Sequence, residues 1–217
     1  TGLPFNSVIA LELHGGKPLS PLVNAGAIAT TSLINAENVE QRWQRILHIQ
    51  QQLAGEQVAL SDEVNQSEQT TNFHNRAIAW LLYSAGYLYC DAMEACDVYT
   101  RQCSTLLNTI ELATLGATLA AGGVNPLTHK RVLQADNVPY ILAEMMMEGL
   151  YGRSGDWAYR VGLPGKSGVG GGILAVVPGV MGIAAFSPPL DEDGNSVRGQ
   201  KMVASVAKQL GYNVFKG

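Results

Sequence analysis

The residues best suited to chemistry lie in the glycine-rich stretch Gly162–Gly172, which contains Lys166 and Ser167. Such a stretch has few side chains to pack, and glycine lets backbone N–H groups approach a ligand closely. Backbone donors that point at one position stabilise an oxyanion that develops there. The pattern therefore predicts an oxyanion-binding loop. Its structural alternative is a lysine at the entry to a strand, beside a small turn.

Lys166-Ser167-Gly168 ahead of a strand is similar to the K-T/S-G element of penicillin-recognising serine enzymes. In that scheme a serine in an S-x-x-K motif comes well before the K-T/S-G element. The chain holds one S-x-x-K, from Ser205 to Lys208, and it comes afterwards. We therefore interpret Ser205 and Lys208 as ordinary residues on a helix surface.

Three polar residues are candidates for holding a substrate. Asn24 is flanked by small apolar residues, so it either caps a helix or holds a ligand, and capping is the favoured interpretation. Glu68 and Asn75 are seven residues apart and share a face if one helix spans both. A carboxylate and an amide on one face would suit the ammonium and carboxylate of an amino acid, whereas solvated helix polarity is the alternative.

Two tyrosines are further candidates. Tyr151 follows a predicted helix in a glycine-flanked segment, where it is either a packed turn aromatic or a proton donor beside a nucleophilic serine. Tyr99 lies on a predicted helix and is interpreted from its position as a core or interface residue. The four histidines are too dispersed to predict a metal site, and no metal is expected.

Composition limits the partners. The net charge is −4 and basic residues are scattered singly, so neither nucleic acid nor an anionic membrane is an expected partner. No unbroken apolar run reaches the roughly 18 residues that a membrane helix needs. Three cysteines, an odd number, argue against a disulfide framework. We expect buried thiols on or near one helix and a reducing, cytoplasmic location.

The elements that must position these residues are mostly helical. Capping patterns begin helices at Asp91 and Asn108, each with Glu three residues later. Two apolar runs joined by Pro178-Gly179 predict a hairpin, Gly172–Val177 and Met181–Phe186. Two or three strands make a poor sheet alone, so the fold is either mostly α or has strands elsewhere. The predicted helices are 39–53, 72–85, 91–107, 108–122, 135–148 and 196–210.

Seven segments, in the right order along the chain, resemble the glutaminase family of bacteria and mitochondria. They are Gly2–Ser7, Val23–Ile28, Asn75–Ala79, Ala117–Gly123, Val161–Gly172, Phe186–Asp191 and Gly194–Gly199. The resemblance implies an α/β (α+β) chain with a β-lactamase-like α/β/α sandwich and a helical region. It implies one catalytic domain over residues 1–217, helical at about 24–150, rich in strands at about 160–190, and ending in a helix at about 196–210.

The resemblance also implies an activity, the hydrolysis of L-glutamine to L-glutamate and ammonia through a serine γ-glutamyl ester. The family's S-x-x-K serine and lysine are expected upstream of Thr1. We therefore expect the chain to be incomplete at its N-terminus and, alone, inactive. No cofactor is expected, and a homodimer or homotetramer is implied. The glutamine-binding positions that match the family are Asn24, Glu68, Asn75, Tyr99, Tyr151 and Val169.

Each matching position has a role that its chemistry can explain. Glu68 would accept from the α-ammonium, and Asn24 and Asn75 would donate to the α-carboxylate. Tyr99 would close the pocket with its hydroxyl. Val169 would give its backbone N–H to the oxyanion, while Tyr151 would act catalytically by protonating the departing ammonia.

Lys166 would supply positive charge near the site. Two alternatives stay open. One is another serine hydrolase of the penicillin-recognising type, against which the set of Asn24, Glu68 and Asn75 argues because it suits a free α-amino acid. The other is a catalytically inactive binding or assembly fragment.

Overall fold

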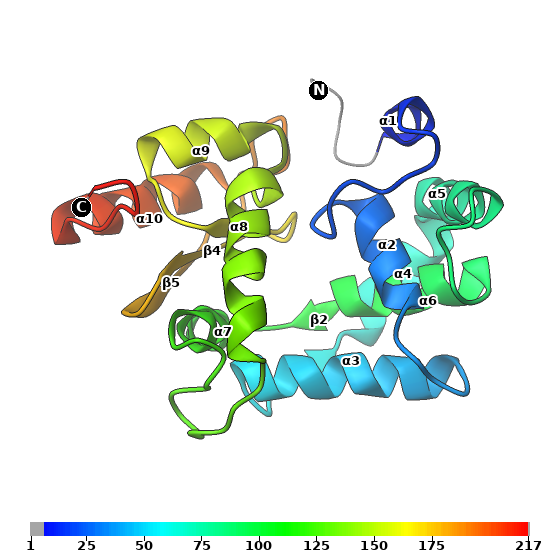
Figure 1. Cartoon of the computed structure of the whole chain (residues 1–217), viewed down its shortest axis with the longest axis horizontal. Coiled ribbons are helices and arrows are strands. Elements are labelled where there is room, and N and C mark those ends of the chain that lie inside the picture. The colour runs from blue at the N-terminus through cyan, green and yellow to red at the C-terminus, as the bar shows by residue number, and fades with distance from the viewer. Residues whose placement is uncertain (1–6, 217) are drawn as a thin grey trace. The chain divides into compact units, whose positions relative to one another are not determined.

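The computed structural model describes residues 7–216 in two compact units. Most of the segment Gly2–Ser7 lies outside the described residues. Unit 1 comprises Val58–Leu106 and the described residues up to Gln50. Unit 2 comprises Gln51–Gln57 and the described residues from Leu107 onward. Figure 1 labels most of the helices and strands of both units.

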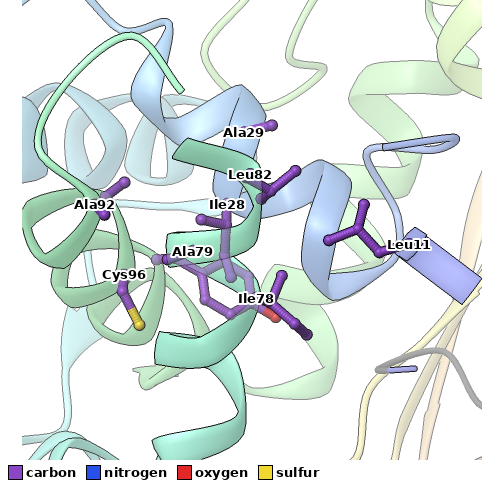
Figure 2. Close-up of a cluster of buried hydrophobic side chains, with 10 residues drawn as sticks. Leu11, Ile28, Ala29, Ile78, Ala79, Leu82, Ala92 and Cys96 are labelled. Carbon is purple, nitrogen blue, oxygen red and sulfur yellow. The ribbon is translucent and has the colours of Figure 1, made fainter. Parts of the chain in front are cut away.

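Unit 1 is mainly helical, and α3, which was predicted at 39–53, ends at Ala54 just inside unit 2. Three helices, α2, α5 and α6, pack around one apolar core. Figure 2 shows Ile28 of α2, Ala79 of α5 and Cys96 of α6 in this core. Its elements are α1 (Val8–Leu13), α2 (Asn24–Ser32), α3 (Val39–Ala54), β1 (Ala59–Leu60), α4 (Asp62–Thr71), α5 (Phe73–Ser84), α6 (Ala92–Cys103) and β2 (Thr105–Leu106).

The helix predicted from Asp91 to about Leu107 begins as expected but ends early. Asp91 caps it by accepting from the backbone N–H of Met93 and Glu94. The helix ends at Cys103, and the next residues form β2, which pairs with β1. The predicted end was wrong because the pairing partner, Ala59–Leu60, is distant in sequence.

Unit 2 contains a sheet and the remaining helices. The capping box of Asn108 and Glu111 is present, and Ser196 caps the last helix. The helix predicted at 135–148 instead opens as a 3-10 turn, with Pro139 in the first turn of the α-helix that follows. The elements are α7 (Thr109–Ala120), η1 (Ala135–Asn137), α8 (Val138–Glu148), η2 (Tyr151–Arg153), α9 (Ser154–Arg160), β3 (Gly165–Ser167), β4 (Gly172–Val177), β5 (Met181–Phe186) and α10 (Val197–Leu210).

The predicted hairpin is confirmed with its bounds, and a third strand joins it. The sheet order is β3-β4-β5 and all pairs are antiparallel. Lys166 lies opposite Leu174, so the Lys-Ser-Gly element does not merely precede the hairpin: its lysine and serine belong to the edge strand β3. The strand β3 has three residues, which are too few for an alternation of apolar and polar residues to reveal a strand in the sequence.

Helices cover both faces of this sheet. Ile173, on β4, packs in a core with Val203 of α10, whereas its neighbour Leu174 points to α7. Successive residues of a strand face opposite sides, so α7 and α10 lie on opposite faces (Figure 1). On the α7 face a Cβ at Gly182 would lie 2.3 Å from the carbonyl oxygen of Ala113, so this close approach requires glycine.

The three cysteines are thiols with different environments. Cys96 is buried in the core of unit 1, and burial raises the pKa of its thiol to about 11. Cys90 is half-buried, while Cys103 is exposed at the end of α6. The expectation of buried thiols was therefore wrong for Cys103. Within residues 7–216, no helix combines the length and apolar character needed to cross a bilayer.

Candidate active site

Asn24 and Asn75 are brought together in unit 1. Asn24 is the first residue of α2, and Asn75 lies in the first turn of α5. The side-chain amide of Asn24 donates a hydrogen bond of 2.8 Å to Oδ1 of Asn75. Both side chains are half-buried, so they are held in place and remain accessible.

The capping role favoured for Asn24 is wrong. Val23 occupies the N-cap position of α2, and no side chain caps this helix. Asn24 instead donates one hydrogen of its side-chain amide to Asn75 of another helix. Asn24 is one position after the cap, and the sequence does not distinguish the two positions because the boundaries of a helix are uncertain by one or two residues.

This pair lies where two helices begin. The first backbone N–H groups of a helix lack intrahelical partners, and the helix dipole makes this end electropositive. Both properties favour an anion such as a carboxylate. The pairing of Asn24 with Asn75 at the starts of α2 and α5 is therefore suited to a substrate carboxylate.

Glu68 and Asn75 do not share one helix, contrary to the geometry considered from the sequence. Glu68 lies on α4 and Asn75 on α5, and the chain turns between them at Asn72. Asn72 is buried, and its side-chain amide donates to the hydroxyl of Thr100 on α6 at 2.8 Å. Glu68 is exposed, and within residues 7–216 its carboxylate has no hydrogen bond or ion pair, so it can accept from a cation.

Tyr99 lies on α6 and is 8% exposed. It belongs to the same apolar core as Ile28 and Ala79, as its helical position predicted. Its ring therefore stabilises the packing of the helices that carry Asn24 and Asn75.

An open hollow of about 190 Å³ also lies in unit 1, beside α2. Ser20, Thr30 and Tyr87 are among its lining residues. None of the predicted substrate-binding residues of this unit lines it.

Tyr151 and Lys166 meet in unit 2. The ammonium of Lys166 lies 3.4 Å from the hydroxyl of Tyr151 and 4.4 Å from its ring centroid. The same ammonium donates to the backbone carbonyl of Ser167. Tyr151 has φ +54°, a conformation that is rare for a residue other than glycine. Such strain occurs often at functional sites, where the surroundings hold it.

The loop after β3 presents Val169 to solvent. Gly168 N–H donates to Gly172 O at 3.0 Å, and Gly171 N–H donates back to Gly168 O at 2.9 Å. Val169 itself is 59% exposed, and among the described residues its backbone N–H has no acceptor. A fixed loop with an available amide is the geometry that an oxyanion donor needs.

Ser167 does not face solvent. It is 2% exposed, and its hydroxyl donates to Oδ1 of Asn195 at 2.5 Å. The sequence had given Asn195 no role, although it lies in a segment that carries the family resemblance. A run of turn residues, Asp191–Asn195, was the available signal.

Ser205 and Lys208 are exposed on α10, and Ser205 accepts from Gln209 one turn away, which confirms their surface position. In the described part of the chain, no group of three or more His, Cys, Asp or Glu residues is arranged to hold a metal ion.

Comparison with known proteins connects these features. The glutaminase family model matches residues 1–215. Glutaminase 1 of Escherichia coli O6:H1 is 99% identical over 217 residues, which are 100% of this chain and 70% of that protein. The chain belongs to the glutaminase family. Membership agrees with the resemblance stated from the sequence motifs.

Solved glutaminases share the fold of this family member. A probable glutaminase from Bacillus subtilis has a TM-score of 0.95 at 34% identity, over 99% of this chain and 72% of that one. A Bacillus subtilis glutaminase in covalent complex with 5-oxo-L-norleucine has a TM-score of 0.88 at 31% identity, over 97% of this chain and 79% of that one. The predicted mixed α/β class with a β-lactamase-like fold is confirmed by this likeness.

Proposed function

We propose that this glutaminase hydrolyses the side-chain amide of L-glutamine to L-glutamate and ammonia through a serine ester. The observation that carries the chemistry is the placement of the Lys166 ammonium 3.4 Å from the Tyr151 hydroxyl. An ammonium group beside a phenol favours transfer of the phenol's proton. The same positive charge stabilises an oxyanion that forms nearby. The reaction of a Bacillus subtilis relative with 6-diazo-5-oxo-L-norleucine supports a covalent route.

Four polar residues suit the α-amino acid end of the substrate. Glu68 would accept hydrogen bonds from the α-ammonium, because it is an exposed carboxylate. Asn24 and Asn75 would donate to the α-carboxylate with the amide hydrogens that their mutual bond leaves over. Tyr99 would add its hydroxyl to the pocket.

Val169 and Tyr151 suit the reacting amide. A serine hydroxyl gives its proton to the lysine of the family's S-x-x-K motif while its oxygen attacks the side-chain carbonyl carbon, and the carbonyl oxygen becomes an oxyanion that Val169 N–H would stabilise. The C–N bond then breaks, and the leaving nitrogen takes a proton, which Tyr151 would deliver to give ammonia and would recover from that lysine. Water attacks the γ-glutamyl ester and releases glutamate and the serine hydroxyl.

The test combines turnover with covalent labelling. The test uses protein expressed at the full length of its relatives, because this chain covers 70% of Glutaminase 1 of Escherichia coli O6:H1. The purified protein is assayed for ammonia release from glutamine and then treated with 6-diazo-5-oxo-L-norleucine, and the modified peptide is identified by mass spectrometry. We expect turnover, and one adduct on a serine other than Ser205. Ser205→Ala is the control and keeps full turnover, because Ser205 is exposed on α10.

Three results would contradict the proposal. Turnover that disappears in Ser205→Ala would place the nucleophile in α10. Acylation by a penicillin with no release of ammonia would favour another hydrolase of the penicillin-recognising type. Absence of turnover and of every adduct would favour a binding or assembly role.

We also propose a homodimer or homotetramer in the cytoplasm. The family resemblance supports the assembly, which light scattering during gel filtration measures. The three thiols support a reducing compartment, because disulfides persist mainly in oxidising ones. Cell fractionation tests the location.

A further inference from the structure

Asn195 is a buried amide that the proposed chemistry does not use. It lies between β5 and α10 and is 0% exposed. Its Oδ1 accepts from the Ser167 hydroxyl at 2.5 Å, and its Nδ2 donates to the backbone carbonyl of Leu150 at 3.3 Å. A buried amide is tolerated only when its donors and acceptor are satisfied, so both contacts fix its place.

These two partners of Asn195 are sequence neighbours of Lys166 and Tyr151, the proposed catalytic pair. Ser167 follows Lys166, and Leu150 precedes Tyr151. The backbone adds a further contact, because Ser167 N–H donates to Gly149 O at 3.0 Å. Asn195 therefore joins the strand that carries Lys166 to the segment that carries Tyr151.

Asp191 fixes the position of Asn195 by accepting two hydrogen bonds from it. Oδ1 of Asp191 accepts from the backbone N–H of Asn195 at 2.9 Å and from its Nδ2 at 3.3 Å. The other carboxylate oxygen accepts from Gln200 of α10 at 2.9 Å. The amide can turn over only by placing its oxygen against the Asp191 carboxylate, so its orientation toward Ser167 is determined.

We propose that Asn195 is a positioning residue that sets the separation between the Lys166 ammonium and the Tyr151 hydroxyl. This inference rests on the proposed function. Tyr151 is strained at φ +54°, and such a conformation persists only where its surroundings hold it. A displacement of about 1 Å in reacting groups can lower the rate by about 10²-fold. Asn195, which we call a clamp because it is hydrogen-bonded to both Ser167 and Leu150, should therefore affect turnover.

The test compares two buried asparagines of unit 2. Asn125 is 2% exposed, its Nδ2 donates to Gln52 O at 2.8 Å, and its Oδ1 accepts from Leu127 N–H at 2.9 Å. In the described part of the chain, the side-chain hydrogen bonds of Asn125 go to Gln52, Leu53, Leu127 and Thr128. Asn195→Ala and Asn125→Ala therefore remove similar numbers of buried hydrogen bonds, and only the first removes the clamp.

We expect Asn195→Ala to lower kcat for glutamine by about 10-fold to 10²-fold and to change KM by less than about threefold. Asn125→Ala should lower Tm comparably and keep kcat within about threefold. Equal losses of kcat in the two variants, or a loss that falls on KM alone, would overturn the proposal. If Asn195→Ala does not fold, Ser167→Ala decides: it removes the 2.5 Å bond, and unchanged kcat would overturn the proposal.

A second measurement does not depend on turnover. In a crystal structure of Asn195→Ala, or of Ser167→Ala, we expect the distance from Lys166 Nζ to the Tyr151 hydroxyl to exceed the 3.4 Å of the unaltered protein. An unchanged distance would overturn the positioning role. If the unaltered protein releases no ammonia, the proposed function fails. The distance between Lys166 Nζ and the Tyr151 hydroxyl still tests whether Asn195 sets their separation.

Discussion

The side chains of Asn24 and Asn75 share a hydrogen bond of 2.8 Å across 51 positions of sequence. The bond uses one hydrogen of Asn24 and the oxygen of Asn75. The amide group of Asn75 has no acceptor among the described residues, so it can donate to a ligand. One asparagine thus orients the other, and the two should act on the substrate as a unit.

The first prediction concerns this coupling. Asn24→Ala and Asn75→Ala should each raise KM for glutamine, because each removes a side chain that we propose as a donor to the α-carboxylate. The double variant should lose less than the sum, with a coupling of about 0.5–1.5 kcal/mol in kcat/KM, the usual worth of one hydrogen bond. Steady-state kinetics on the four proteins measure it. Strict additivity would show that the pair does not act together.

Glu68→Gln keeps the shape of the side chain and removes its charge. A charge-assisted hydrogen bond is worth roughly 1.5–3 kcal/mol, so kcat/KM should fall by about 10-fold to over 100-fold. Glu63→Gln on the same helix is the matched control, because Glu63 is also exposed. Similar kinetics for both variants and the unaltered protein would exclude the ammonium-binding role.

Tyr151→Phe removes only a hydroxyl. If that hydroxyl delivers a proton, turnover should fall by roughly 10²–10⁴-fold while the fold is kept. Tyr159→Phe provides the comparison, because Tyr159 is 89% exposed on α9 of the same unit. Turnover and Tm are measured together. A lower Tm with near-normal turnover would make Tyr151 a packing residue.

Asp191→Asn should change the pH dependence of stability. Burial pushes the pKa of the Asp191 carboxyl up, but hydrogen bonds from Asn195 N–H, the Gln200 side chain and Asp193 N–H outweigh it and hold the pKa below its ordinary value. The ionised form therefore stabilises the folded protein above the ordinary pKa near 4, and this contribution is lost as pH falls through the lowered value.

At pH 7 the variant should be less stable by about 1–3 kcal/mol, since hydrogen bonds to a charged group are lost. The difference should shrink as the pH falls below about 4. Urea unfolding across pH measures both. Glu192→Gln, at an exposed neighbouring position, should show a much smaller effect at pH 7. A difference from Asp191→Asn that stays constant down to pH 2 would refute the linkage.

The thiols should react in order of exposure. With a pKa of about 11, the Cys96 thiol is almost entirely neutral at pH 8, and it is 2% exposed. Cys103 is exposed and should be alkylated first by iodoacetamide. Peptide mass spectrometry over time follows each site. Equal labelling rates for Cys96 and Cys103 in folded protein would contradict the burial of Cys96.

The sequence by itself determined the local elements of this protein and its family. The capping box of Asn108 and Glu111 was predictable because its partners are three residues apart. The bounds of β4 and β5 followed from two apolar runs around one turn. The long motifs around Lys166 indicated the glutaminase family before any geometry was known.

Only the tertiary structure decided how the candidate residues are held. The break between α4 and α5 depends on Asn72, whose amide donates to Thr100 28 positions away. The clamp at Asn195 depends on Ser167, also 28 positions away. A local pattern records neither partner, because a buried amide is oriented by whichever groups the folded chain brings within about 3 Å.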